Sequence, residues 1–254
     1  MPSITLLGYP LSTLILYFCF YSFIGWCMES TYCSVIERRL VFRGFLHGPI
    51  CPIYGVGVLL MILFFQPLAD DILLFYLVST VTMSAWEYFV GWFLEVTTHM
   101  KYWDYSMFRF NLKGRICLWV SLTWGLLSYV CIFWIHPPVE QTIARIPAQL
   151  QDILAAVLAL TVLVDALITI WQLASMTAVM GVLRRMGAFI PDSLSEGGAK
   201  LRARFGDLFA SAERLTRRFR RNYADFRVMD KRLPAHLVSQ LFGRGTRNEK
   251  DEPQ

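Results

Sequence analysis

Five apolar stretches, separated by short polar segments, set the pattern of the chain. They run over about Ile4–Met28, Ile53–Phe65, Ile72–Thr98, Ile116–Ile135 and Ile153–Leu183. Because a helix needs about 20 mainly apolar residues to cross a bilayer, the pattern predicts an all-α, polytopic membrane protein with five transmembrane helices. Glycines and prolines precede the second stretch, so residues 44–52 are predicted to be a loop or a partly re-entrant segment. His136-Pro137-Pro138 is expected to end the fourth helix.

The first four helices are predicted to form a tandem repeat with an offset of 66 residues. Without gaps, residues 23–51 and 89–117 share 11 identities in 29 positions, whereas unrelated segments of this composition should share roughly two. An apolar bias does not reproduce the identities Gly25/Gly91, Trp26/Trp92, Glu29/Glu95, Arg43/Arg109, Gly48/Gly114 and Cys51/Cys117. We therefore expect repeat A at about 11–69, repeat B at about 77–135 and a fifth span at about 153–183. A two-helix unit returns the chain to the same side, so the copies should be parallel, related by an axis along the membrane normal.

The end of the chain has a different pattern. Apolar residues between Leu201 and Leu233 mostly follow helical three-and-four spacing, with arginines on the other faces. This predicts a basic amphipathic helix at about 199–233. The helix could lie on anionic lipid headgroups, pack against a partner or a second copy of the chain, or dock on the chain's own cytoplasmic loops. We thus divide the chain into a transmembrane domain, 1–183, and a cytoplasmic tail, 184–254.

Composition supports the membrane assignment. The 254 residues are 56% hydrophobic and 17% charged, with a mean hydropathy of +0.46, outside the range of ordinary soluble domains. Residues 1–183 hold 8 basic and 10 acidic residues, and residues 184–254 hold 16 and 9. Basic residues alternate between the connecting segments, which predicts an extracytoplasmic N-terminus and a cytoplasmic C-terminus. No basic residue precedes the first apolar stretch, so this span is expected to be retained and not cleaved as a signal peptide.

Glu29 and Glu95 are the main candidates for a functional site. Each lies near the cytoplasmic end of its span, four residues after a glycine on the same helix face. Because a charge in a span usually faces a cavity or a partner, the two carboxylates, with Arg43 and Arg109, could form one substrate or ion site. The alternative is that each glutamate pairs with its own arginine to fix a loop.

Other polar residues extend this hypothesis. Glu87 and Asp165 lie deeper in their spans and are candidates for proton coupling, although a helix-packing hydrogen bond explains them nearly as well. His47, beside Arg43 in a flexible loop, could help to bind a phosphate or carboxylate headgroup. Asp104, in an interfacial aromatic segment, is a possible partner for one of the arginines.

Several classes of chemistry have no support in the sequence. There is no G-x-x-x-x-G-K-[ST] loop, no H-E-x-x-H, no G-x-S-x-G and no Cys/His spacing typical of a metal site. The six cysteines lie in or beside apolar stretches without a C-x-x-C pair, which indicates packing thiols. We therefore expect no cofactor or metal, no nucleic-acid binding and no classical catalytic motif.

Three motifs carry a resemblance to a known family. They are Gly25-Trp26-x-x-Glu29, then Arg43-Gly44-Phe45-Leu46-x-Gly48-Pro49-x-Cys51-Pro52-Ile53-Tyr54-Gly55, and Trp103-Asp104-Tyr105-Ser106 with Asn111-x-x-Gly114-Arg115-x-Cys117. In these, the sequence resembles the bacterial membrane family labelled ABC-transporter type IV, the CmpB-like permeases, over roughly residues 10–135. The resemblance implies a multi-pass permease of the bacterial inner membrane, working with a separate ATPase, and it adds Asn111 to the candidate substrate-binding residues.

Two other functions stay open at this point. Arg43, His47 and Glu29 lie near one membrane face, where headgroups are available, which fits an intramembrane enzyme that modifies lipids. The tail alone would fit a non-catalytic scaffold. The expected partners are the bilayer, anionic headgroups at the tail, an ATPase subunit and a second copy of the chain.

Overall fold

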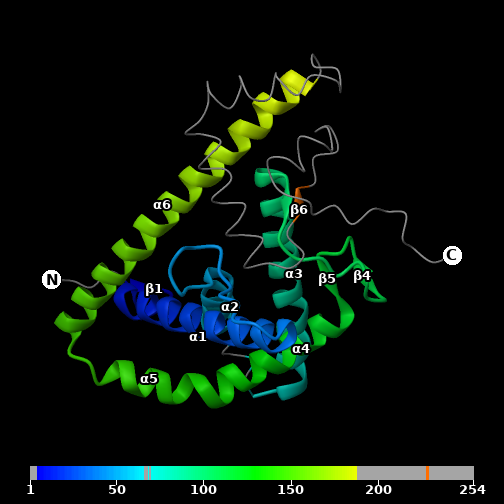
Figure 1. Ribbon diagram of the computed structural model, residues 1–254. Coiled ribbons are helices and arrows are strands. Elements are labelled where there is room, and N and C mark those ends of the chain that lie inside the picture. Colours follow the sequence, from blue (N-terminus) through cyan, green and yellow to red (C-terminus); the bar gives the residue numbers. More distant parts are fainter. Residues whose placement is uncertain (1–4, 66–67, 69, 188–226, 229–254) are drawn as a thin grey trace. The chain divides into compact units, whose positions relative to one another are not determined.

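The computed structural model describes residues 5–65, 68, 70–187 and 227–228. The helices are α1 (Leu11–Glu37), α2 (Pro52–Phe64), α3 (Ile72–Thr98), α4 (Leu118–Val130), the π-helical segment η2 (Cys131–Ile135), α5 (His136–Ala144) and α6 (Ala148–Gly187). The strands have two residues each: β1 (Thr5–Leu6), β2 (Tyr9–Pro10), β3 (Met100–Lys101), β4 (Asn111–Leu112), β5 (Ile116–Cys117) and β6 (Arg227–Val228). Figure 1 shows the ribbon.

Four helical stretches within the described residues are long and apolar enough to cross a membrane. They are Leu11–Glu37, Ile72–Thr98, Leu118–Ala144 and Ala148–Ser175. The prediction of a mostly helical membrane protein is confirmed, and the third helix has the predicted bounds. The second apolar stretch forms α2, which has 13 residues. Since a straight crossing needs about 20 residues, α2 is too short to cross by itself.

The first helix begins later than the sequence predicted. Residues 5–10 form an antiparallel hairpin, with a turn at Leu7 and Gly8. Both turn residues have positive φ, 49° and 88°, as two-residue hairpins with the right twist require. Pro10 is the N-cap of α1, and a proline is tolerated there because it lacks only an N–H that the helix does not need. The apolar pattern could not separate this hairpin from the helix because both are uncharged.

The prediction that His136-Pro137-Pro138 ends the fourth helix is wrong. The helical path continues through η2 into α5 and ends at Ala144. Both prolines lie in the first turn of α5, and the N–H of His136 bonds the carbonyl of Cys131, five residues back. The wider π-turn thus accommodates the two prolines without a break in the helix. His136 stays buried, and its Nδ1 lies 3.0 Å from the hydroxyl of Tyr21 on α1.

The segment between α1 and α2 runs back along α1. The N–H of Val41 bonds the Ser34 hydroxyl at 2.9 Å, that of Arg43 bonds Ser30 at 3.1 Å, and that of Cys51 bonds the carbonyl of Ser22 at 2.9 Å. The chain has therefore returned to the middle of α1 when α2 begins, and α2 then packs against α1 (Figure 1). A Cβ at Gly55 would overlap the Ser22 side chain, so a glycine is required at this contact.

The chain divides into two compact units, residues 1–92 with 104–167 and residues 93–103 with 168–254. The core of the first unit joins α1, α2, α3, η2, α5 and α6 through side chains that include Tyr17, Met61, Phe75, Ile132 and Ala155. In the second unit, β3 pairs with β6 in an antiparallel ladder. Residues 227–228 are thus a strand where a helix was predicted, and the rest of the predicted helix at 199–233 lies outside the described residues.

Candidate functional site

Glu29 lies on α1, one turn after Gly25, and α2 reaches it through a tyrosine. The Tyr54 ring lies against Gly25, where a Cβ would overlap the ring. This close approach brings the Tyr54 hydroxyl to Glu29, and it donates a hydrogen bond of 2.9 Å to Oε1. The predicted role of Gly25, to allow close helix contact beside the carboxylate, is seen in these contacts.

Glu87, in the middle of α3, is more deeply buried. Only 4% of the surface of Glu87 is exposed. The Tyr105 hydroxyl donates to Oε1 at 3.0 Å, and the indole N–H of Trp124 donates to Oε2 at 3.0 Å. Burial, and then the charge of Glu87, raise the pKa of Tyr105, so this hydroxyl keeps its proton at neutral pH. Both donors are neutral groups.

The two carboxylates are connected through their donors. The rings of Tyr54 and Trp124 contact each other with centroids 5.3 Å apart, and Glu29 and Glu87 interact electrostatically. We call these residues, Glu29, Tyr54, Trp124, Glu87 and Tyr105, the acidic network. It draws on α1, α2, α3, α4 and the segment before β4, and all five residues belong to the first unit. Like charges so placed disfavour ionisation of both groups at once.

Arg43 supplies the cationic neighbour of the network. It is half-buried, its Nε donates to the Cys33 sulfur at 2.9 Å, and its charge acts favourably on Glu29. Cys51, the N-cap of α2, is a buried free cysteine in the same region.

Asp165, on α6, holds the segment that precedes α2. Its Oδ1 accepts from the N–H of His47 at 2.9 Å and lies 3.0 Å from Nδ1 of the His47 ring, and its Oδ2 accepts from the N–H of Gly48 at 2.7 Å. A single carboxylate thus satisfies two backbone donors of a non-helical segment that lies beside the spans. We call these contacts of Asp165 with His47 and Gly48 the clamp.

Asp104 and Asn111 shape the segment before α4. Asp104 accepts from the N–H of Ser106 at 3.1 Å. Asn111 donates to the carbonyl of Phe108 at 2.8 Å and accepts from the N–H of Gly114 at 3.0 Å. These are local turn contacts of the kind that Asx side chains make, and a role of either residue in substrate binding stays a prediction.

The family model described as Putative ABC-transporter type IV matches residues 16–170, more than half of the chain. The chain belongs to this family. Its apolar helices and its membership in this transporter family fit a multi-pass membrane transport protein. No match was found among curated proteins or among solved structures.

The family match also covers Glu95 and Arg109. That these two residues share one site with Glu29 and Arg43 stays a prediction. Glu95 is half-buried in the second unit, and Arg109 is exposed in the first. The carboxylate that is connected to Glu29, through the rings of Tyr54 and Trp124, is Glu87. Glu87 has no acidic counterpart in repeat A, since residue 21 is a tyrosine. Within the described part of the chain, no group of three His, Cys, Asp or Glu side chains could hold a metal.

Sequence reasoning missed the three donors of the acidic network. Tyr54 lies in the Pro-Ile-Tyr-Gly string that carries the family resemblance, so a polar role could have been inferred from its place in that motif. Tyr105 was grouped with an interfacial aromatic segment, and Trp124 lies in an uncharged run. For Trp124 the sequence carries no signal, because its role depends on which helix faces Glu87.

Proposed function

We propose that this chain is a transport permease whose transport site is the acidic network, with Arg43 beside it. The observation that carries the proposal is that two intramembrane carboxylates, Glu29 and Glu87, meet through Tyr54 and Trp124 inside one helical unit. Ionisable residues within spans usually mark ion, substrate or proton pathways. Glu87 takes the proton-coupling role, and Glu29 with Arg43 contacts the substrate.

The irregular second crossing supports the same proposal. Residues 41–51 run back along α1 to its middle, and α2 completes the crossing from there. Transporter sites are often built beside such discontinuous helices near the bilayer midplane. With this broken crossing the chain passes the membrane five times, from an extracytoplasmic N-terminus to a cytoplasmic tail. Cysteine labelling should then find Glu37 and Met107 on the same side, and opposite sides would contradict this topology.

The starting points of two helices support the proposed parallel repeat. α2 and α4 begin directly after Cys51 and Cys117, at an offset of 66 residues, although α4 continues through η2 into α5. In the proposed repeat, Glu95 and Arg109 form the polar pair of the second copy and complete one cytoplasm-facing site with Glu29 and Arg43. His47 lies in the segment that Asp165 holds, and it is included in the proposed site.

The proposed permease works in the bacterial inner membrane with a separate ATPase, because the chain has no P-loop. The basic tail, net +7 over residues 184–254, rests on anionic headgroups. The direct test is purification of the full chain from native membranes in a mild detergent, followed by mass spectrometry of the proteins that accompany it. Stoichiometric recovery of an ATPase supports transport; a lipid that is chemically converted by the purified chain supports a lipid-modifying enzyme instead.

A second experiment addresses the site itself. Dicyclohexylcarbodiimide modifies protonated carboxyl groups in apolar surroundings, and peptide mass spectrometry locates the adduct. We expect adducts at Glu29 and Glu87 in the native chain, and no adduct at Asp165, whose oxygens accept three hydrogen bonds. Labelling confined to Asp165 would contradict the proposed site.

A further inference from the structure

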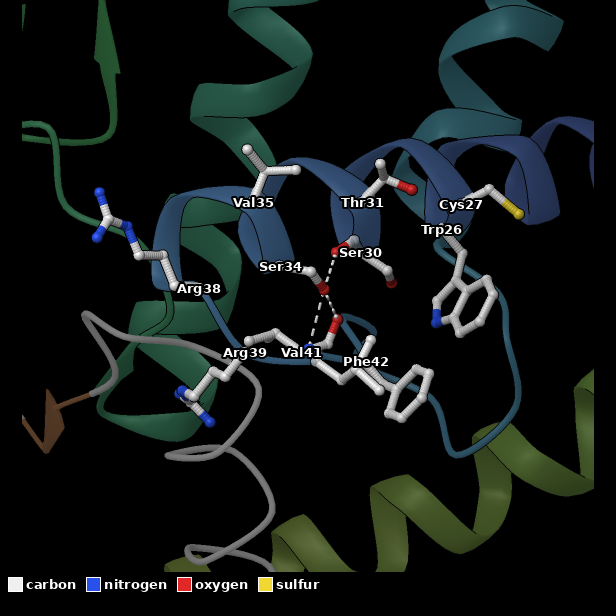
Figure 2. A pocket seen from close by; sticks show the side chains of 11 residues that line it. Trp26, Cys27, Ser30, Thr31, Ser34, Val35, Arg38, Arg39, Val41 and Phe42 are labelled. Atoms are coloured by element: carbon white, nitrogen blue, oxygen red, sulfur yellow. Dashed lines mark hydrogen bonds between the residues drawn. The ribbon is translucent and has the colours of Figure 1, made fainter.

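An open groove runs along the last turns of α1, apart from the acidic network. Its volume is about 610 Å³. The chain leaves α1 at Arg38, whose φ of 50° reverses its direction, and the segment Leu40–Phe42 forms the opposite wall. The Ser34 hydroxyl accepts from the N–H of Val41 at 2.9 Å and lies 3.3 Å from its carbonyl. These bonds fix the wall to the helix, so the groove is a built feature (Figure 2).

The two ends of the groove differ in chemistry. Trp26 and Phe42 line one end, with rings stacked at 6.1 Å and an interplanar angle of 3°. Arg38 and Arg39 lie at the other end, and Val35 adds an apolar side chain to the lining (Figure 2). The groove is therefore amphipathic along its length.

Its place on α1 matches one leaflet of a bilayer. From Trp26 to Arg38 the helix rises about 18 Å at about 1.5 Å per residue, close to half of a hydrocarbon core of about 30 Å. Charged residues follow at Glu37, Arg38 and Arg39, where α1 ends, and this marks the water boundary. The apolar end thus lies at acyl-chain depth and the arginine end at headgroup depth.

The charges favour an anionic occupant. Arg39 forms an ion pair with Glu37, so the pair is neutral, and exposed Arg38 adds one positive charge at the headgroup end. A guanidinium binds phosphate oxygens through two N–H groups. We propose that this groove binds one anionic phospholipid, with its phosphate at Arg38 and an acyl chain toward Phe42 and Trp26. The proposal does not depend on the transport function, because none of these residues belongs to the acidic network.

Photo-crosslinking in the membrane tests the site in the full chain. p-Benzoylphenylalanine replaces either Val35, which lines the groove, or Ile36, the exposed neighbour that the groove does not include. The proteins are placed in nanodiscs of phosphatidylcholine with a minority of phosphatidylglycerol. Crosslinks at position 35 should be enriched in phosphatidylglycerol by about fivefold over the bulk lipid, the ratio that one basic residue near an anionic lipid supplies. Crosslinks at position 36 should follow the bulk composition.

A charge variant completes the experiment. Arg38→Gln should remove the enrichment at position 35, whereas the matched control Arg145→Gln, which removes an exposed arginine after α5, should keep it. The proposal would be overturned if the crosslinks at positions 35 and 36 had the same lipid composition. It would also be overturned if Arg38→Gln and Arg145→Gln reduced the phosphatidylglycerol enrichment at position 35 equally. Crosslinks from position 35 to a peptide would show that a second copy or another segment of this chain occupies the groove, and would overturn it as well. If Arg38→Gln fails to fold, the comparison of positions 35 and 36 still decides.

Discussion

Glu87 and Asp165 both carry a carboxylate within a membrane-spanning helix, and the groups around them are of different kinds. Glu87 is bonded by two neutral side-chain donors from Tyr105 and Trp124. Asp165 is bonded by the backbone N–H groups of His47 and Gly48 and by the His47 ring. From the sequence the two residues are equivalent candidates for proton coupling. Their surroundings differ, because Asp165 bonds the backbone of a loop, whereas Glu87 is connected to Glu29 through Trp124 and Tyr54.

The difference shows how the function of an intramembrane carboxylate depends on its donors. Backbone donors in a non-helical segment need an acceptor at all times, so an acid that bonds them cannot exchange its proton or partner without loosening the fold. Side-chain donors such as Tyr105 and Trp124 can rotate or rebond. Proton coupling stays a prediction for both residues, and the side-chain donors make Glu87 the candidate that we propose.

The largest effect should come from Asp165→Ala. Two backbone N–H groups, of His47 and Gly48, lose their acceptor, and each unsatisfied group costs about 1–3 kcal/mol. We expect a loss of about 3 kcal/mol in the free energy of unfolding, seen as a lower thermal midpoint in detergent. Asp152→Ala, at an exposed position near the start of α6, is the control and should leave the midpoint unchanged. An unchanged midpoint for Asp165→Ala would mean that the clamp does not hold the segment.

Glu87→Gln should show the opposite pattern to Asp165→Ala, with a small loss of stability and a complete loss of transport. The glutamine can accept from Tyr105 or Trp124, so we expect a stability loss of only about 1 kcal/mol. Transport should be abolished, because an amide cannot bind and release a proton. The carbodiimide adduct at Glu87 should disappear while that at Glu29 remains. A variant that unfolds as readily as Asp165→Ala would show that Glu87 is a structural residue too.

How much of the fold and of the candidate site could be predicted from the sequence depends on whether the interactions are local or join distant parts of the chain. The apolar pattern predicted α2 and α3 to within a residue of their bounds, since periodicity and hydropathy are local properties. It failed at Pro137, because a π-turn upstream accommodates the proline, and at residues 5–10, because an uncharged hairpin has the same composition as the helix it precedes. The pairing of Glu29 with Glu87 depends on the packing of α1, α2, α3 and α4, which no single stretch encodes.

Tyr54→Phe should cost less stability than Asp165→Ala and, unlike Glu87→Gln, it leaves both carboxylates in place. The ring stays against Gly25 and Trp124, and only the hydrogen bond to Glu29 is lost. We expect a cost of about 1 kcal/mol, the usual value for one hydrogen bond. If Tyr54 couples Glu29 to Glu87, Tyr54→Phe should change the rate of carbodiimide labelling at both glutamates. A change at Glu29 alone would separate the acidic network into two independent sites.

The smallest stability effect should come from Arg109→Ala, and its comparison with Arg43→Ala tests the repeat. Arg43 is half-buried, bonds Cys33 and acts on Glu29, so its loss should cost about 1 kcal/mol. Arg109 is exposed, and surface substitutions rarely change stability, so its thermal midpoint should match that of the native chain. If the two copies share one polar site, both variants should nevertheless lose transport in proteoliposomes that hold the chain together with its ATPase, because each arginine then faces the same substrate. Loss of transport in Arg43→Ala alone would restrict the site to the acidic network, and the identity of residues 43 and 109 would then reflect duplication without a shared role.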